Sequence, residues 1–262
     1  MIQPNSVIQG DSLEVMKDIP DKSIDMILCD LPYQTTACKW DTIIPFEPLW
    51  EQYKRIIKDN GAIVLTASQP FTSALVMSNI KMFKYCWVWD KKKGGNIMNL
   101  KSQPYKVHED VCVFSIKPHL YYPIMTDQKE RTGKTYSKGE ANGIENYGDT
   151  RMYNKKYPKS ILEVSNADQS NKTHPTQKPV ALFEYLIKTY TNEGDLVLDN
   201  CIGSGTTAVA CINTKRNFIG MELSEEYCKI ANERLTKLND GIPPNHKGSL
   251  TAKVLGIQPT II

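Results

Sequence analysis

An acid, a proline and an aromatic residue follow directly after an apolar run near the start of the chain. The run SIDMIL at residues 23–28 is apolar enough for a buried strand, and the sequence continues as CDLPY. A fold has no need of a carboxylate at the end of a buried strand, because burial costs the carboxylate its hydration. Pro32 also fixes the backbone beside it. Residues 30–33 therefore indicate a chemical site.

A second candidate site lies in LVLDNCIGSGTTAVAC, which starts at residue 196. An apolar strand ends in Asp199, and Gly203 and Gly205 precede a helix, so backbone amides can approach a ligand closely. The next strand ends at Glu222, and an acid there can accept hydrogen bonds from two ribose hydroxyls. The layout indicates an adenosine-type cofactor without saying which one. A tight strand–helix turn is the structural alternative, and an alanine leaves the GxGxxG pattern of NAD sites incomplete.

Strand and helix patterns alternate along most of the chain. Strands are predicted over residues 6–10, 23–30, 62–67, 84–90, 110–115, 195–200 and 217–222, and helices over 12–19, 46–61, 70–80, 179–191, 204–213 and 224–238. Gly61 fits a helix C-cap. This alternation predicts an α/β fold with three layers. Residues 116–172 carry no regular pattern.

Positive charge is concentrated in the middle of the chain. Residues 91–172 contain 15 Lys and Arg against 9 Asp and Glu, whereas the whole chain has a net charge of only +3. Tyrosines lie among these basic residues, as in KPHLYYP and RMYNKKYPK. Basic groups contact phosphates and aromatic rings stack on bases, so the segment suggests a surface that faces nucleic acid. A solvated loop region is the alternative.

The composition argues against several classes of protein. No run of 18 apolar residues occurs, so neither a membrane-spanning helix nor a membrane partner is expected. The first residues lack the apolar region of a secretory signal. The seven cysteines form no CxxC pair, so no zinc ribbon or other metal site is expected. We expect reduced thiols and a cytoplasmic protein.

Five stretches together resemble the β-class of amino-group DNA methyltransferases, which methylate adenine N6 or cytosine N4. SIDMILCDLPY resembles the strand and DPPY loop of this family, and GDSLEVM resembles its upstream motif for the cofactor adenine. THPTQKPVALFEYLI resembles the HPTQKP helix, LDNCIGSGTT the DPFxGSGTT loop and GMELSEEY the ribose-binding acid. The order of these motifs is also that of the β-class, and the resemblance covers about residues 6–238.

The resemblance implies a Rossmann-like class I methyltransferase fold with S-adenosylmethionine as the cofactor. The sheet would be mostly parallel and seven-stranded, with a circularly permuted motif order. Residues 1–238 would form the catalytic domain, residues 91–172 an inserted target-recognition region, and residues 239–262 a C-terminal tail. The residues expected to contact DNA are Lys91, Lys92, Lys93, Arg131, Lys134, Lys155 and Lys156.

The resemblance also gives residues 30–33 a chemical role. An exocyclic amine is a weak nucleophile, and its attack on a sulfonium methyl builds positive charge on the nitrogen. Asp30 would accept one N–H and the Leu31 carbonyl the other, which stabilises this charge. Pro32 would fix the turn, and Tyr33 would offer a face on which the base stacks. A base inside a duplex must be flipped out to reach such a site.

Cofactor binding is assigned by the same resemblance. Asp11 would contact the cofactor adenine, with a helix N-cap as the alternative role. Thr176 and Lys178 would face the cofactor carboxylate, with solvation at a helix start as the alternative. The full set is Asp11, Asp30, Thr176, Lys178, Asp199, Gly203, Ser204, Gly205, Thr206, Thr207 and Glu222.

The sequence departs from the family pattern at a few positions. Leu31 stands in place of proline, which function should tolerate because the family uses the backbone carbonyl there. Asn200 and Cys201 replace Pro-Phe, so the packing of the cofactor adenine is expected to differ in detail. The acid at position 30 resembles adenine-specific enzymes, since serine is commoner there in cytosine N4 enzymes. We therefore favour adenine N6.

Three functional hypotheses follow. The favoured one is a site-specific DNA adenine N6-methyltransferase, acting on double-stranded DNA and encoded by a bacterium or a phage. The second is the same chemistry on cytosine N4, on RNA or on a protein glutamine. The third is a non-catalytic DNA-binding protein, which would be expected to have lost Asp30 or the glycine loop. A dehydrogenase does not account for DLPY or HPTQKP. A homodimer and a cognate restriction endonuclease are left open as partners.

Overall fold

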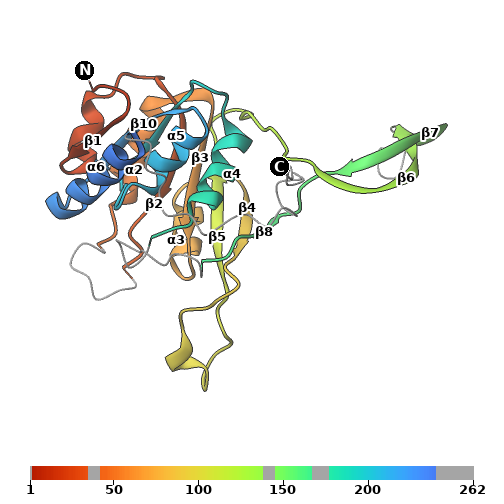
Figure 1. Ribbon diagram of the computed structural model, residues 1–262, viewed down its shortest axis with the longest axis horizontal. Coiled ribbons are helices and arrows are strands. Elements are labelled where there is room, and N and C mark those ends of the chain that lie inside the picture. The colour runs from red at the N-terminus through yellow and green to blue at the C-terminus, as the bar shows by residue number, and fades with distance from the viewer. Residues whose placement is uncertain (1, 35–41, 138–144, 167–176, 240–262) are drawn as a thin grey trace. The chain divides into compact units, whose positions relative to one another are not determined.

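Figure 1 shows the computed structural model, which describes residues 2–34, 42–137, 145–166 and 177–239. The strands are β1 (Ser6–Gln9), β2 (Ile24–Asp30), β3 (Ile57–Ala67), β4 (Phe83–Asp90), β5 (His108–Phe114), β6 (Thr126–Ser137), β7 (Glu145–Lys156), β8 (Ile161–Glu163), β9 (Leu196–Asp199) and β10 (Asn217–Glu222). The helices are α1 (Ser12–Val15), α2 (Phe46–Ile56), α3 (Phe71–Ser78), α4 (Val180–Tyr190), α5 (Thr206–Asn213) and α6 (Glu225–Asn239), with 3₁₀ turns η1 (Met16–Asp18) and η2 (Ile97–Asn99). Among the described residues, every helix is too short or too polar to cross a membrane.

The chain divides into two compact units. The main unit contains Met1–Tyr122 and Ser160–Ser249, and it holds both candidate sites. The second unit contains Pro123–Lys159. The strands β5 and β8 lie inside the predicted target-recognition region but pair with strands of the main sheet. The assignment of residues 91–172 to target recognition stays a prediction, and it includes strands of the main sheet.

The main unit is built on one mixed sheet. Its strand order is β1-β10-β9-β2-β3-β5-β4-β8, and all neighbours run parallel except β5 with β3 and with β4. The predicted α/β fold with a mostly parallel sheet is confirmed. The predicted number of seven strands was wrong, because the described residues form eight. The additional strand, β8, has three residues, which is too short a pattern to be recognised in the sequence.

Helices cover both faces of this sheet and give it three layers. On one face, α2 and α3 pack with Ile27 and Cys29 of β2 in one apolar cluster. Met26 and Leu28 are as deeply buried but lie outside that cluster, because alternate side chains of a strand point to opposite faces. The helices α4, α5 and α6 pack together, and α4 contacts β2. Burial on both faces explains the continuous apolar run before Asp30.

The sheet order brings acidic residues to one edge. Asp30, Asp199 and Glu222 are the last residues of β2, β9 and β10, which are parallel neighbours. Asp11 follows β1, the next strand in the row. Because parallel strands end at the same edge, ligands of open α/β sheets bind there. The fold therefore places both candidate sites side by side.

The predicted end of the helix over residues 46–61 was wrong. The helix α2 ends at Ile56, and β3 begins at Ile57, so Gly61 lies inside a strand instead of capping a helix. A Cβ atom at Gly61 would lie 2.7 Å from the carbonyl oxygen of Asp25 and 2.7 Å from Cδ1 of Ile57. Close approach of the neighbouring backbone, and not a helix end, explains this glycine.

Part of the region predicted to be irregular is an antiparallel ribbon. The strands β6 and β7 pair over most of their length, with Thr126 opposite Lys156 and Arg131 opposite Tyr153. Figure 1 shows them as two long strands of the second unit. Most of the described side chains on this ribbon are exposed, so there is no alternation of apolar and polar residues to reveal its strands.

The crowding at Gly61 leads to a stability prediction. We expect Gly61→Ala to lower the free energy of unfolding by about 1–3 kcal/mol, because the added methyl overlaps backbone that cannot move aside. Urea unfolding followed by circular dichroism measures this change. Gly95→Ala is the matched control, since nothing lies within 4 Å of a Cβ atom there. Equal stability of the two variants would contradict the packing described for β3.

Candidate active site

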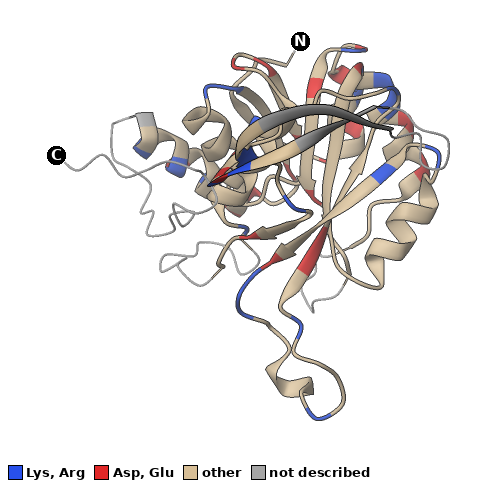
Figure 2. Cartoon of the chain, turned by 90° about the vertical axis from the view of Figure 1, so that its right-hand side faces the viewer, with Lys and Arg blue, Asp and Glu red and all other residues tan. Residues whose placement is uncertain are grey.

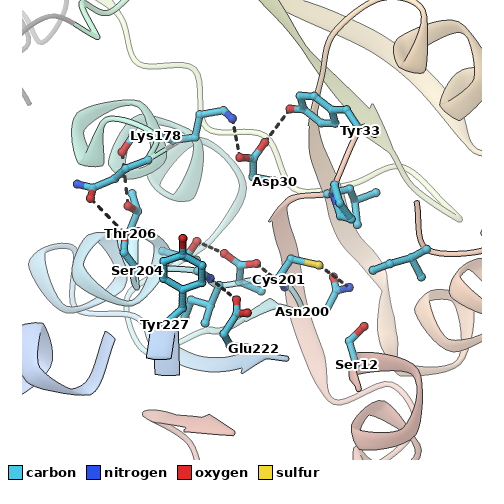
Figure 3. Close-up of a pocket in the computed structure, with 18 of the residues that line it drawn as sticks. Ser12, Asp30, Tyr33, Lys178, Asn200, Cys201, Ser204, Thr206, Glu222 and Tyr227 are labelled. Atoms are coloured by element: carbon cyan, nitrogen blue, oxygen red, sulfur yellow. Dashed lines mark hydrogen bonds and ion pairs between the residues drawn. The ribbon is translucent and has the colours of Figure 1, made fainter. Parts of the chain in front are cut away.

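A cavity of about 850 Å³ opens at the edge where the acidic residues meet. Its volume is in the usual range for small-molecule sites, about 300–1,000 Å³. Figure 3 shows that the labelled side chains on its walls come from the ends of several strands and from the loops and helices that follow them. The lining includes Asp11, Asp30, Leu31, Pro32, Tyr33, Lys178, Asp199, Gly203, Ser204, Thr206, Thr207 and Glu222.

Asp30 is held through both of its carboxylate oxygens. Oδ2 accepts a hydrogen bond from Nζ of Lys178 at 2.5 Å. Oδ1 accepts from the hydroxyl of Tyr33 at 2.7 Å and from the hydroxyl of Thr66. The Asp30 side chain is 22% exposed, and Figure 3 shows it between Lys178 and Tyr33. An ionised carboxylate has about four acceptor positions, so one is left for a donor from a ligand.

Lys178 lies two residues before α4, and its side chain is almost completely buried. A buried ammonium group requires carboxylate partners. Burial by itself would lower the pKa of Lys178, but the carboxylates of Asp30 and Glu109 raise it above its ordinary value. Nζ of Lys178 lies 3.6 Å from Oε2 of Glu109, whose Oε1 accepts from Nζ of Lys91 at 2.8 Å. Two lysines and two carboxylates thus alternate along the cavity wall.

Tyr33 is fixed by stacking and by its hydroxyl. Its ring stacks on Phe71, with the ring centroids 5.1 Å apart and the planes inclined by 30°. Nζ of Lys178 lies 5.5 Å from the centroid of the Tyr33 ring. Burial, followed by the carboxylates of Asp30 and Glu109, raises the pKa of Tyr33 well above its ordinary value. The phenol therefore stays protonated and acts as a hydrogen-bond donor.

Gly203 and Glu222 line the cavity together, whereas Gly205 lies outside its lining and against Ala231 of α6. Gly203 and Gly205 have φ angles of 52° and 84°, a region that favours glycine, and Gly205 is the N-cap residue of α5. The carboxylate of Glu222 accepts from the backbone N–H of Gly203 at 2.9 Å and from that of Ser224 at 2.9 Å. Each oxygen of Glu222 keeps a second lone pair, which a ribose hydroxyl could use.

Asp199 fixes the start of the glycine loop through buried hydrogen bonds. Its side chain is buried and accepts hydrogen bonds from the hydroxyl of Thr207 and from the backbone N–H of Cys201. Burial raises the pKa of Asp199 to about 7. Asp199 thus ties the end of β9 to the first turn of α5, while part of it still lines the cavity.

The remaining predicted cofactor residues are arranged around this loop. Asp11 is the N-cap of α1 and accepts from the N–H of Leu13 at 2.8 Å, which is the alternative role considered for it. The hydroxyl of Ser204 donates to Gln177 at 3.2 Å. The hydroxyl of Thr206 lies 3.5 Å from the carbonyl oxygen of Lys178. Thr176 lies outside the described residues.

Two residues that contact the site were not found from the sequence. Glu109 lines the cavity and faces Lys178, and Thr66 donates to Asp30. These contacts join residues that are far apart in the chain, so no local pattern reveals them. One signal was available for Glu109. It lies near the start of β5, which is antiparallel to β3 and therefore begins at the edge where β2 ends.

The residues predicted to contact DNA differ in their exposure. Lys91 is largely buried against Glu109 and lines the cavity, so it is not placed on an open surface. Lys92 is exposed and pairs with Asp90 and Glu163. Lys93 is exposed in the loop between β4 and β5, where Figure 2 shows basic residues at both ends and at the tip. In the second unit, Arg131, Lys155 and Lys156 are exposed, and Lys134 belongs to β6.

The chain is similar to known proteins over most of its length. Residues 24–233 match the profile of a family described as DNA methylase, of the N6 and N4 type. The DNA adenine methyltransferase YhdJ of Escherichia coli (strain K12) is 30% identical over 252 residues, which cover 89% of this chain and 83% of that protein.

Two solved structures illustrate the similarity of fold. The crystal structure of an M1.HpyAVI–SAM complex superposes with a TM-score of 0.59 at 26% identity, over 88% of this chain and 98% of that chain. The cytosine-N4-specific PvuII DNA methyltransferase superposes with a TM-score of 0.65 at 18% identity, over 92% of this chain and 93% of that chain. The second identity is so low that it supports the fold alone.

The buried acid at the end of β9 leads to a pH prediction. Burial raises the pKa of Asp199 from 3.8 to about 7, so between these values the unfolded chain releases a proton that the folded protein keeps. This group therefore lowers stability as the pH rises through that window. We expect Asp199→Asn to gain stability relative to the wild type from pH 5 to pH 7, by at most about 1.4 kcal/mol per pH unit.

Urea unfolding of both proteins at several pH values measures this difference. Because all other acids are shared, their titration cancels when the two curves are subtracted. A difference that does not change with pH would contradict the description of Asp199 as a buried acid.

Proposed function

The chain belongs to the DNA methylase family of N6 and N4 amino-group methyltransferases, and from this premise we propose that it methylates N6 of adenine in duplex DNA. It is a site-specific DNA amino-methyltransferase that uses S-adenosylmethionine. The observation that carries the proposal is the carboxylate of Asp30, held at the cavity with acceptor capacity to spare.

The cavity fits S-adenosylmethionine in size and in the groups that it presents. When bound, this cofactor supplies an electrophilic methyl group on a sulfonium. We assign Glu222 to the ribose hydroxyls, because two backbone N–H groups hold its carboxylate and leave lone pairs for further donors. Gly203 lets the backbone approach the cofactor closely, Gly205 lets α5 begin close to α6, and Asp199 keeps their loop in place. Asp11 is proposed to lie near the cofactor adenine.

Asp30 and its neighbours are proposed to activate the target amine. The carboxylate of Asp30 accepts one N–H of the amine, and the carbonyl of Leu31 accepts the other. Both acceptors gain strength as positive charge develops on the nitrogen, because they are already oriented and need no reorganisation. Pro32 sets the backbone of this turn. Tyr33 lines the cavity beside Asp30 and is proposed to contact the face of the base.

The target base is proposed to leave the duplex. Asp30 lies inside a cavity and is 22% exposed, so it cannot reach an amine that is paired and stacked within a helix. Flipping the nucleotide out is the general solution for enzymes that modify a base. All residues of this mechanism come from one chain. A homodimer and a cognate restriction endonuclease stay predictions that the chemistry does not require.

The choice of adenine rests on the acid at position 30 and on the similarity to YhdJ, which is named as an adenine methyltransferase. Cytosine N4 is the second candidate. The family profile covers both reactions. Both bases present an exocyclic amine with two N–H groups, so the same acceptors would serve either one.

Methyl transfer from radiolabelled S-adenosylmethionine to mixed-sequence duplex DNA tests the proposal. We expect label in N6-methyl-2′-deoxyadenosine after the DNA is digested to nucleosides. We expect Asp30→Asn to slow the transfer by about 100- to 1,000-fold, because the variant keeps the shape of the side chain but loses the charged acceptor.

Equilibrium binding of S-adenosylmethionine to both proteins is the control, since both must be folded and able to bind. Label in N4-methylcytosine would overturn the assignment to adenine and keep the mechanism. Equal rates for wild type and Asp30→Asn would contradict the role of Asp30.

The exposed basic residues of the second unit are proposed to contact DNA phosphates. We expect the double variant Lys155→Ala, Lys156→Ala to bind duplex DNA more weakly. Its affinity should also depend less on salt, with the logarithmic slope reduced by about 0.9 for each lost phosphate contact. Fluorescence anisotropy at several salt concentrations measures both effects.

Lys229→Ala is the control, because Lys229 is an exposed lysine on α6, outside the predicted target-recognition region. An unchanged salt slope in the double variant would remove these two lysines from the DNA interface.

A further inference from the structure

Glu109 presents a carboxylate oxygen that has no hydrogen bond. Among the buried side-chain nitrogen and oxygen atoms of the described residues, Oε2 of Glu109 alone lacks a hydrogen-bond partner. It lies 3.6 Å from Nζ of Lys178, which is beyond the usual length of a charge-assisted hydrogen bond, about 2.7–2.9 Å. Buried acceptors are nearly always satisfied, so an unsatisfied one beside a buried cation requires an explanation.

We propose that Glu109 is a second binding position for the ammonium group of Lys178, which moves from Asp30 to Glu109 when the amino group of the target base binds Asp30. The proposal rests on the proposed methyl transfer and adds a positioning residue to it. Glu109 does not touch the substrate in this account, because it acts through Lys178.

The charges at Asp30 explain why Lys178 should move. In the structure, Nζ of Lys178 lies 2.5 Å from Oδ2 of Asp30. The target amine is proposed to bind this carboxylate and to become positive during methyl transfer. An ammonium group at the same carboxylate would repel that developing charge and would weaken Asp30 as an acceptor. Movement of Lys178 toward Glu109 relieves the repulsion and frees Oδ2.

The geometry makes this movement short. A shift of Nζ by about 1 Å toward Oε2 of Glu109 would complete a hydrogen bond of ordinary length. The ammonium group keeps a carboxylate partner at both positions, so it is never left buried and unpaired, which is the costly state. The ammonium group of Lys178 is therefore paired with a carboxylate whether it lies at Asp30 or at Glu109.

Glu109 is itself held in place for this role. Its Oε1 accepts from Nζ of Lys91 at 2.8 Å, and the backbone N–H of Lys91 donates to the carbonyl of Val107 at 2.8 Å. The side chains of Lys91 and Glu109 are only 12% and 15% exposed. The anchor on Oε1 therefore leaves Oε2 directed toward Lys178.

Single-turnover methyl transfer by Glu109→Gln tests the proposal. The variant keeps the size of the side chain but cannot neutralise an ammonium group. We expect the chemical step to slow by roughly 10- to 100-fold, a smaller effect than the loss of a direct contact to the reacting atoms. Binding of S-adenosylmethionine should change by less than about twofold, because no proposed cofactor contact is lost. Glu109→Asp, which retains the charge, should recover part of the rate.

A double-variant analysis separates this role from a structural one. In a Lys178→Met background, Glu109→Gln should have no further effect on the rate, because there is no ammonium group to receive. Lys91→Met should likewise slow the step only where Lys178 is present, since it removes the contact that holds Glu109 in place. Thermal unfolding of every variant confirms that the proteins compared are folded.

The outcomes separate the proposed methyl transfer from the role of Glu109. A wild-type protein that transfers no methyl group to DNA would contradict the proposed function itself. With an active wild type, an unchanged rate in Glu109→Gln would overturn the role of Glu109, as would an equal loss in both backgrounds. A crystal structure with a cofactor analogue and target DNA gives a second readout. It should place Nζ of Lys178 within about 3.2 Å of Oε2 of Glu109, whereas Nζ still on Asp30 would overturn the proposal.

Discussion

The ion pair between Asp30 and Lys178 is the contact on which the candidate site depends. It joins the end of β2 to a residue just ahead of the N-cap of α4, and it lies beside the hydroxyls of Tyr33 and Thr66 that hold the other carboxylate oxygen. A buried ion pair adds little to stability compared with apolar residues of similar size, while loss of one partner leaves the other unpaired. The pair is therefore better explained by the chemistry of Asp30 than by the stability of the fold.

Strand order is the constraint that makes this chemistry possible. Because β1, β10, β9 and β2 are parallel neighbours, four acids meet along one edge of the sheet, and each has different hydrogen-bond partners. Asp11 caps α1, Glu222 accepts from two backbone amides, and Asp199 is buried with its pKa raised to about 7. Asp30 alone is paired with a buried lysine. One row of carboxylates thus supports a loop through Asp199, and we propose that it binds the cofactor through Glu222 and the target amine through Asp30.

Features that arise from local burial are predictable from the sequence, whereas features that arise from contacts between distant segments are not. Strands β2, β9 and β10 were predictable because burial on both faces requires an apolar run, and the acids that end these runs stand out. The end of α2 was missed because Gly61 looks like a cap, whereas its reason is the backbone carbonyl of Asp25 from a different strand. Glu109 was missed because its contact with Lys178 forms only in the folded chain. The ribbon of β6 and β7 has no apolar alternation to reveal it.

The central claim is that Glu222 binds the cofactor ribose while Asp30, in the same cavity, binds the target amine beside the reactive methyl. A crystal structure of this protein with S-adenosylmethionine tests it most directly. The account predicts ribose hydroxyls bound to the carboxylate of Glu222 and the reactive methyl directed toward Asp30. A cofactor with its ribose away from Glu222, or with its methyl turned from Asp30, would contradict the account.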